Sequence, residues 1–223
     1  MSINKKLDVA IIGAGFAGVG AGIKLRQRKD VSFKIFEKSN DVGGTWRDNT
    51  YPGCACDIPS NLYSYSFEPN PEWSKAFSPH NEIHDYLKHC VHKYKIEDAI
   101  QFCTEIQKTF FDVPNGHWVL TDTKGEIYIA RTIISASGPL NQPLYPKVKG
   151  LTSFKGESFH SLYWNHNYSL KGEKVAVIGT GASAIQFIPE IAKQAGKLTV
   201  FQRTAPWIEP KLNRENTNKT KNR

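Results

Sequence analysis

The chain has 223 residues, of which 39% are hydrophobic and 22% charged, as in an ordinary globular protein with one large core or two small ones. Its net charge of +8 is uneven, because residues 211–223 hold five cationic side chains against one acidic side chain. The rest of the chain is only mildly basic. This argues against a nucleic-acid-binding surface and suits an anionic dinucleotide.

The cysteines show neither a C-x-x-C pair nor the density of a disulfide framework, which predicts free thiols in a reducing, cytoplasmic compartment. The apolar segment 9–23 follows two lysines, so a secretory signal is an alternative. The segment is too short to span a membrane and lacks a small-residue cleavage site, so we expect no membrane association. The cysteines are Cys54, Cys56, Cys90 and Cys103.

Residues 7–12 are a short apolar run typical of a buried parallel strand, and a glycine turn and a helical stretch ending near Lys29 follow. Residues 31–36 predict a second strand, which completes a βαβ unit. Residues 43–80 are rich in glycine, proline, asparagine and aromatic residues without a period. This composition predicts a long ordered loop over a ligand.

Apolar residues at helical spacing predict an amphipathic helix from Asn81 to about Tyr94. Strands are then expected over 100–112, 117–122 and 126–135, joined by Asn-Gly and Lys-Gly turns into a β-meander. Three prolines between Gly138 and Gly150 mark a crossing between domains, and residues 174–202 start a second βαβ unit. The tail from Lys211 has no apolar period and is expected to be disordered.

The first glycine turn carries a dinucleotide fingerprint. Gly13-Ala14-Gly15-Phe16-Ala17-Gly18 follows a predicted strand and opens a helix, and Glu37 ends the next strand. The first glycine permits the tight turn, the second admits a pyrophosphate to the helix N-terminus, and the third allows close packing of helix on strand. Glu37 is expected to accept hydrogen bonds from ribose hydroxyls.

A second fingerprint, Gly179-Thr180-Gly181-Ala182-Ser183-Ala184, has the alanine that the motif allows at its third position. The strand that follows ends at Phe201-Gln202-Arg203-Thr204, with arginine where an NAD-specific site has an acid. A guanidinium can hold a ribose 2′-phosphate through two hydrogen bonds, so the sequence favours NADPH over NADH. An ordinary surface arginine is the alternative.

Two other clusters suggest chemistry only weakly. Cys54 and Cys56 are candidates for a redox disulfide, but one intervening residue makes a strained ring and the usual motif is C-x-x-C. The histidines of the helix after Asn81, with Cys90, have no known metal-ligand spacing, so a solvated helix face is the expected explanation and no metal is predicted.

Two further motifs resemble those of Baeyer–Villiger monooxygenases. The stretch from Phe154 to Trp164 reads F-x-G-x-x-x-H-x-x-x-W, with Gly156 and His160 at the other fixed positions. The stretch from Gly43 to Asp57 reads G-G-x-W-x-x-x-x-Y-P-G-x-x-x-D. Asn165 departs from the usual Pro or Asp, which leaves an N- or S-oxygenating flavin monooxygenase as an alternative.

The resemblance implies an enzyme in which NADPH reduces FAD and O2 forms a C4a-peroxyflavin that converts a ketone into an ester or lactone. It places Trp46, Asp57 and Tyr63 against the flavin, gives Asp57 a supporting catalytic role, and assigns His160 to ordering the linker. The implied FAD contacts are Gly13, Gly15, Phe16, Ala17, Gly18, Glu37, Lys38, Gly44, Thr45, Trp46, Cys56, Asp57, Tyr63 and Ile106. The implied NADPH contacts are Gly179, Thr180, Gly181, Ala182, Ser183, Gln186, Arg203 and Thr204.

The expected fold is therefore α/β, with two incomplete Rossmann-like domains and a β-meander insert in the first. The expected divisions are an FAD-binding part over 1–138, a linker over 139–173, an NADP-binding part over 174–210 and a polar tail over 211–223. Members of the family are more than twice as long, and their catalytic arginine has no counterpart here. We therefore expect a truncated chain, one completed by a C-terminal partner polypeptide, or an inactive dinucleotide-binding fragment.

Overall fold

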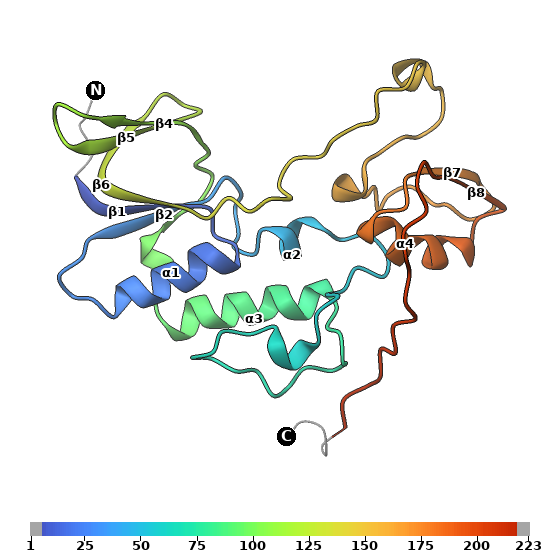
Figure 1. Cartoon of the computed structure of the whole chain (residues 1–223), viewed down its shortest axis with the longest axis horizontal. Coiled ribbons are helices and arrows are strands. Elements are labelled where there is room, and N and C mark those ends of the chain that lie inside the picture. The colour runs from blue at the N-terminus through green and yellow to red at the C-terminus, as the bar shows by residue number, and fades with distance from the viewer. Residues whose placement is uncertain (1–5, 218–223) are drawn as a thin grey trace. The chain divides into compact units, whose positions relative to one another are not determined.

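The structure, a computed structural model, describes residues 6–217 (Figure 1). Its contacts divide into two units, each of which is assembled from two separate stretches of the chain. The first unit is the chain up to Arg47 together with Ile83–Asn141, and the second is Asp48–Glu82 together with the chain from Gln142.

A six-stranded sheet forms the first unit, in the order β3-β2-β1-β6-β5-β4. The strands are β1 (Leu7–Ile12), β2 (Phe33–Phe36), β3 (Ile100–Gln101), β4 (Ile106–Asp112), β5 (His117–Asp122) and β6 (Ile127–Ser135). The strands β3, β2, β1 and β6 are parallel, whereas β6, β5 and β4 form the predicted antiparallel meander. Strand β6 belongs to both parts, since Ala130 pairs with Leu7 of β1 and with Trp118 of β5.

The predicted α/β class is confirmed, but two strand predictions were wrong in their bounds. The run expected over 100–112 is broken, because β3 pairs with β2 whereas β4 pairs with β5. Between them the backbone turns at Cys103, whose φ is 51°, and Thr104 donates its N–H to the Glu37 carbonyl (2.9 Å). The strand expected from Val31 begins at Phe33, because Ser32 bonds to the Asp8 carboxylate instead.

Helix α1 (Phe16–Arg26) lies on the sheet, and α3 (His80–Lys93) lies beyond it (Figure 1). A Cβ at Gly22 would stand 2.6 Å from the Ile35 side chain, so this glycine lets α1 approach β2 closely. The Phe16 and Tyr86 rings stack between α1 and α3, with centroids 6.0 Å apart. The predicted amphipathic helix is confirmed: it buries Ile83, Tyr86, Leu87, Cys90 and Val91. The short helices are α2 (Thr45–Asp48), η1 (Ser60–Leu62), η2 (Glu97–Ala99), η3 (Leu151–Ser153) and η4 (Ser161–Tyr163).

The second unit contains the parallel strands β7 (Lys174–Ile178) and β8 (Lys197–Phe201), connected by helix α4 (Ala182–Ala192). Tyr51 and Cys54 are buried here in one cluster with Val177, Phe187 and Ile191. Residues 48–82, which the sequence assigned to the first domain, thus pack with the second βαβ unit. The assignment of each domain to a cofactor stays a prediction.

Residues 211–217 differ from the expected disordered tail. The Ala76 N–H donates to the Arg214 carbonyl and the Asn216 N–H donates to the Ser74 carbonyl, both at 2.8 Å. The Lys211 ammonium donates to the Cys56 carbonyl, and partial burial lowers the pKa of Lys211. These contacts use backbone and polar groups, so they leave no apolar period in the sequence. The rest of the expected tail, 218–223, lies outside the described residues.

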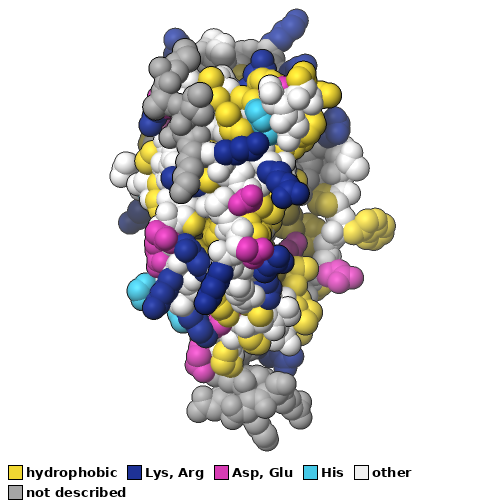
Figure 2. Space-filling view, turned by 90° about the vertical axis from the view of Figure 1, so that its left-hand side faces the viewer, with side chains coloured by type: hydrophobic (Ala, Val, Ile, Leu, Met, Phe, Trp, Pro, Cys, Tyr) yellow, Lys and Arg dark blue, Asp and Glu magenta, His cyan; other side chains and the backbone are white. Residues whose placement is uncertain are grey.

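Within residues 6–217 there is no helix both long enough and apolar enough to cross a bilayer. Figure 2 looks onto the end of the molecule at the left of Figure 1 and shows Lys and Arg side chains interspersed with acidic and apolar ones.

Candidate functional site: two glycine turns

The first glycine turn, between β1 and α1, has no room for side chains. Gly13 has φ +100°, and its N–H donates to the Phe36 carbonyl (2.8 Å). A Cβ at Gly13 would stand 2.6 Å from the Ala136 carbonyl oxygen, and one at Gly18 only 1.8 Å from the Gly13 oxygen. The first and third glycines therefore have the steric roles that the fingerprint predicts.

The start of α1 is suited to an anion. Gly15 precedes the helix in an extended conformation, and no side chain caps the helix. The amides and the dipole of an uncapped first turn attract phosphate groups. Gly43 donates its N–H to the Ala14 carbonyl (2.9 Å), and a Cβ at Gly44 would lie 3.4 Å from the Gly15 Cα. The Gly-Gly loop thus lies directly on the first turn.

Glu37 lies beside this turn with its carboxylate 5% exposed. One oxygen accepts from the Ala14 N–H (2.8 Å), and the other accepts from the Ser39 N–H (3.0 Å) and the Arg47 guanidinium (3.1 Å). These three donors orient the carboxylate and stabilise its charge, and the oxygen that accepts from Ala14 can accept one more hydrogen bond. The arrangement fits a hydroxyl group of a dinucleotide ribose.

Arg47 is a site residue that the sequence reasoning missed. Its side chain is only 12% exposed, and it also donates to the Asp41 carbonyl oxygen. A buried carboxylate requires a partner charge. The only signal in the sequence was a cation directly after Trp46 in the second motif, and that position is variable in the motif.

His84 holds the Gly-Gly loop from α3. Its Nε2 lies 2.9 Å from the Val42 carbonyl oxygen and 3.2 Å from the Asp41 carboxylate. A Cβ at Gly43 would stand 2.7 Å from the imidazole ring, which explains the glycine there. Among residues 6–217 no three His, Cys, Asp or Glu side chains are grouped for a metal ion.

The second glycine turn repeats the first. Gly179 has φ +106°, and its N–H donates to the Phe201 carbonyl (2.8 Å), the counterpart of the bond from Gly13 to Phe36. Gly181 is extended before α4, which no side chain caps, and Ala184 is buried at the third fingerprint position. Both turns thus present a strand end and an uncapped helix start to an anion.

The residues after the second strand of each βαβ unit differ in charge. Directly after Phe36 the first unit has the buried Glu37, whereas after Phe201 the second has Gln202 and then Arg203, which is exposed and makes no ion pair with any residue in the described range 6–217. Thr204 is also exposed, and Thr180 is half-buried. A cation at this place matches a ribose bearing a 2′-phosphate.

The loop that carries Asp57 lies against α4 within the second unit. The Gln186 amide oxygen accepts from the Tyr51 hydroxyl (3.0 Å) and the Ala55 N–H (3.3 Å), and its NH2 donates to the Ala55 carbonyl (2.8 Å). The side chain predicted to contact NADPH thus bonds to this loop. Asp57 is exposed, whereas Cys56 is buried and donates its N–H to the Ser78 carbonyl (2.9 Å).

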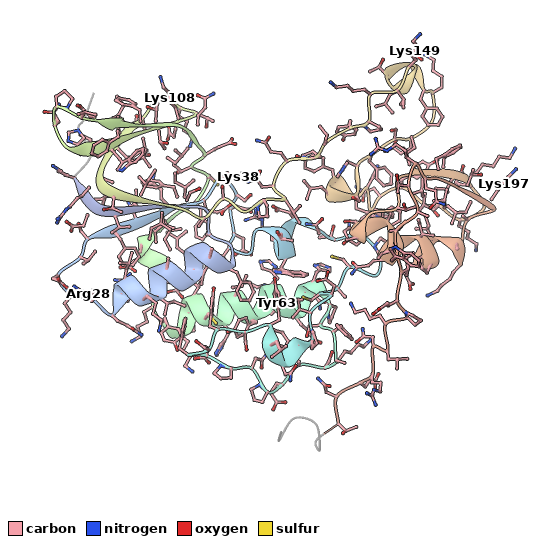
Figure 3. The ribbon with its side chains drawn as sticks, viewed as in Figure 1. Arg28, Lys38, Tyr63, Lys108, Lys149 and Lys197 are labelled. Carbon is pink, nitrogen blue, oxygen red and sulfur yellow. The ribbon has the colours of Figure 1, made fainter. Side chains whose placement is uncertain are left out.

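The predicted FAD residues therefore form two groups. The first-turn residues, Glu37, Lys38, Gly44, Thr45, Trp46 and Ile106 belong to the first unit, with Ile106 half-buried against its core. Cys56, Asp57 and Tyr63 belong to the second unit with the NADPH residues. Lys38, the second residue after β2, is exposed, and Tyr63 is half-buried after η1; both are labelled in Figure 3. Each contact with a cofactor stays a prediction.

Burial makes the two neighbouring thiols unreactive. It raises the pKa of Cys54 to about 11 and also raises that of Cys56, and all four cysteines are free. The thiolate is the reactive form, so a redox role for this pair is disfavoured. With a thiol reagent at pH 8, we expect the exposed Cys103 to be labelled promptly and the other three only after unfolding. Peptide mass spectrometry identifies the labelled thiol, and rapid labelling of Cys54 would contradict the buried arrangement.

The F-x-G-x-x-x-H-x-x-x-W motif forms a structural anchor. A Cβ at Gly156 would stand 2.7 Å from the Phe154 ring, which folds over this glycine. His160 precedes η4 and accepts the Leu162 N–H at Nδ1 (3.1 Å), which supports a role in ordering the linker. The Trp164 ring lies 5.2 Å from the rings of both Phe159 and Phe187. Trp164 thereby attaches the segment to α4.

Trp164→Ala should lower the unfolding midpoint. The half-buried indole packs against the Phe187 cluster, so its removal should cost about 2 kcal/mol, or about 4–8 °C in a protein of this size. Thermal unfolding followed by circular dichroism measures the shift. The control is Tyr163→Ala, because Tyr163 is adjacent and 60% exposed. Equal shifts for the two variants would contradict an anchoring role for Trp164.

A model of the flavin-binding monooxygenase-like family matches residues 5–218. A Baeyer–Villiger monooxygenase of Pseudomonas aeruginosa is 52% identical over 92% of this chain and 39% of its own length. The structure of cyclohexanone monooxygenase from Rhodococcus sp. Phi1 bound to NADP+ matches with a TM-score of 0.92 and 33% identity, over 99% of this chain and 42% of that one. The structure of OTEMO in complex with FAD and NADP matches with a TM-score of 0.91 and 34% identity, over 97% of this chain and 42% of that one.

The chain spans about two fifths of the length of the curated relatives it matches. Within that span the family model covers both glycine turns, the Asp57 loop and the segment from Phe154 to Trp164. The chain therefore belongs to the flavin-binding monooxygenase-like family.

Proposed function

We propose that the first unit binds FAD and the second binds NADPH. The observation that carries the proposal is the repeated turn, in which Gly13 and Gly179 make the same hydrogen bond from a strand end to the neighbouring strand. The buried Glu37 suits a ribose hydroxyl in the first unit, and the exposed Arg203 suits a 2′-phosphate in the second. The known structure of OTEMO is in complex with both FAD and NADP, which supports a separate site for each cofactor.

The reaction we propose is oxygenation of a ketone to an ester or lactone with O2, as the names of the Baeyer–Villiger and cyclohexanone monooxygenases suggest. When bound, FAD supplies the redox chemistry with NADPH and O2. The contribution of this chain is to bind and orient. Glu37 fixes the adenosine end of FAD, Arg203 holds the NADPH 2′-phosphate, and Asp57 supplies a carboxylate at the exposed edge of its loop.

The relatives are longer than this chain. We therefore propose that the activity requires the present residues together with a part equivalent to the remaining three fifths of those relatives. A second polypeptide that supplies this region stays part of the proposal. So does a cytoplasmic location, which the four free thiols support.

Product analysis tests the reaction. The protein with FAD, NADPH and O2 is offered a cyclic ketone, a tertiary amine or a thioether, and products are identified by gas chromatography and mass spectrometry. We expect a lactone from the ketone at a rate above that of amine or thioether oxidation. An N-oxide or sulfoxide without lactone would instead assign the chain to an N- or S-oxygenating enzyme, and no NADPH oxidation with FAD bound would indicate a non-catalytic fragment.

A further inference from the structure

The loop Tyr51–Asp57 is fixed to α4 by side chains of that helix. We infer that Gln186 is a positioning residue that holds the Asp57 loop on α4, so that a dinucleotide bound at the start of α4 also stabilises this loop. The inference rests on the proposed NADPH site and assigns it a second effect. All the contacts that carry it lie within the second unit.

Gln186 forms a paired contact with the backbone of the loop. Its amide oxygen accepts the Ala55 N–H (3.3 Å) and its NH2 donates to the Ala55 carbonyl (2.8 Å). Neighbouring β-strands exchange the same two hydrogen bonds between their peptide groups, so the Gln186 amide takes the place of a backbone peptide group. Asp57 follows two residues later, and its backbone position is set by this contact together with the bond from the Cys56 N–H to Ser78 (2.9 Å).

Tyr51 gives the loop a second attachment. Its hydroxyl donates to Gln186 (3.0 Å), while its ring meets the Phe187 ring edge-on at 5.9 Å. Burial raises the pKa of the phenol, so it stays a protonated donor at neutral pH. If the loop left α4, both this hydroxyl and the Gln186 amide would lose their partners, at a cost of about 1 kcal/mol for each hydrogen bond.

Gly53 shows how closely the loop approaches the helix. Its φ is +79°, and a Cβ would stand 2.9 Å from the Gln186 carbonyl oxygen and 3.1 Å from the Glu190 side chain. The approach therefore requires glycine for its conformation and for its size. Contact this close means that the loop cannot shift on α4 without breaking the Gln186 pair.

Helix α4 itself provides the physical link to the dinucleotide. It begins at Ala182, where the fingerprint places phosphate groups, and Gln186 lies about one turn further along the same helix. A ligand shifts a conformational equilibrium only if it binds the two states differently. An anion at this helix start orders the first turn of α4, and that order favours the state in which Gln186 holds the loop.

Hydrogen exchange of the full chain, read by mass spectrometry on peptides covering residues 51–57, tests the inference with and without NADP+. In the unliganded protein, Gln186→Ala should speed exchange of this peptide about tenfold, since it removes the Ala55 pair, worth about 1.4 kcal/mol. NADP+ should slow the peptide at least threefold in the unmodified protein and not in Gln186→Ala.

Gln194→Ala is the matched control, because in the described range 6–217 the Gln194 side chain makes no hydrogen bond. Tyr51→Phe, which keeps the ring against Phe187, is a milder second variant and should speed exchange about threefold. Equal exchange in Gln186→Ala and Gln194→Ala would overturn the positioning role. A loop in Gln186→Ala that still responds to NADP+ would overturn the link. Absence of NADP+ binding to the unmodified protein would overturn the proposed NADPH site and the link together, while the unliganded comparison would still report on the attachment.

Discussion

Arg203→Ala is expected to weaken NADPH binding about 10- to 100-fold and to leave NADH binding within about twofold. The exposed guanidinium is the second residue after β8, one position beyond the counterpart of Glu37 in the first unit, and it makes no ion pair with residues 6–217. A charge-assisted hydrogen bond to phosphate contributes about 1.5–3 kcal/mol, and only NADPH carries the 2′-phosphate. Calorimetric titration of each dinucleotide measures the two affinities.

Lys197→Ala is the control for charge, since Lys197 lies on the same strand, β8, and is exposed at its start (Figure 3). It should reduce NADPH affinity less than twofold at 0.15 M salt, where distant surface charges are screened. Arg203→Lys should recover part of the loss, because an ammonium keeps the charge without the planar fork. A similar loss of NADPH and NADH affinity in Arg203→Ala would contradict a contact with the 2′-phosphate.

Glu37→Ala is expected to lower FAD affinity by about 100-fold or more. The variant removes the acceptor proposed for a ribose hydroxyl, and one such charge-assisted hydrogen bond is worth about 1.5–3 kcal/mol. It also leaves the Ala14 and Ser39 N–H groups without their acceptor and the Arg47 guanidinium without its partner charge. Quenching of flavin fluorescence on titration measures the affinity.

Glu37→Gln separates charge from shape, because it keeps an acceptor oxygen and the side-chain volume. We expect it to lose about tenfold in FAD affinity, between the unmodified protein and Glu37→Ala. Asp30→Asn serves as the control, since Asp30 is an exposed acid before β2 that pairs only with Arg28 among the described residues. If Glu37→Ala keeps its fold by circular dichroism and binds FAD normally, the ribose contact is wrong.

The sequence predicted those features that depend on local pattern. Strand β1 was predicted with its observed bounds because its six residues lie between a lysine, Lys6, and a glycine, Gly13, which mark where the strand begins and ends. Helix α3 was recognisable because its buried residues recur every three or four positions. The Asn115-Gly116 and Lys124-Gly125 turns were recognisable because both glycines need positive φ, +62° and +83° in the structure.

The features that the sequence did not predict depend on partners far apart in the chain. Whether residues 100–112 form one strand or two is decided by β2 and β5, which draw Ile100 and Ile106 into different pairings. The attachment of Ala55 to Gln186 joins positions 131 apart. The pairing of Arg214 with Ala76 uses backbone groups, which every residue has and which therefore leave no trace in composition.

At the candidate site the same distinction applies. Glycine spacing and the type of charge at Glu37 and Arg203 could be predicted, because Gly18 is required by its contact with Gly13, and Gly13 and Gly179 are required by their positive φ. Arg47 was not legible, since its role depends on a carboxylate ten residues earlier becoming buried beside it. The sequence assigned Gln186 to the cofactor because its position in α4 could be predicted. Its contact with the distant Ala55 could not.

The visible absorption spectrum of the purified chain, recorded after incubation with FAD and desalting, tests the account most directly. We expect retained flavin absorbance that bleaches with NADPH faster than with NADH and recovers in air, as follows if the first unit holds the flavin and the second selects the 2′-phosphate, as we propose. A chain that is folded by circular dichroism yet retains no flavin would contradict the assignment of the first glycine turn to FAD.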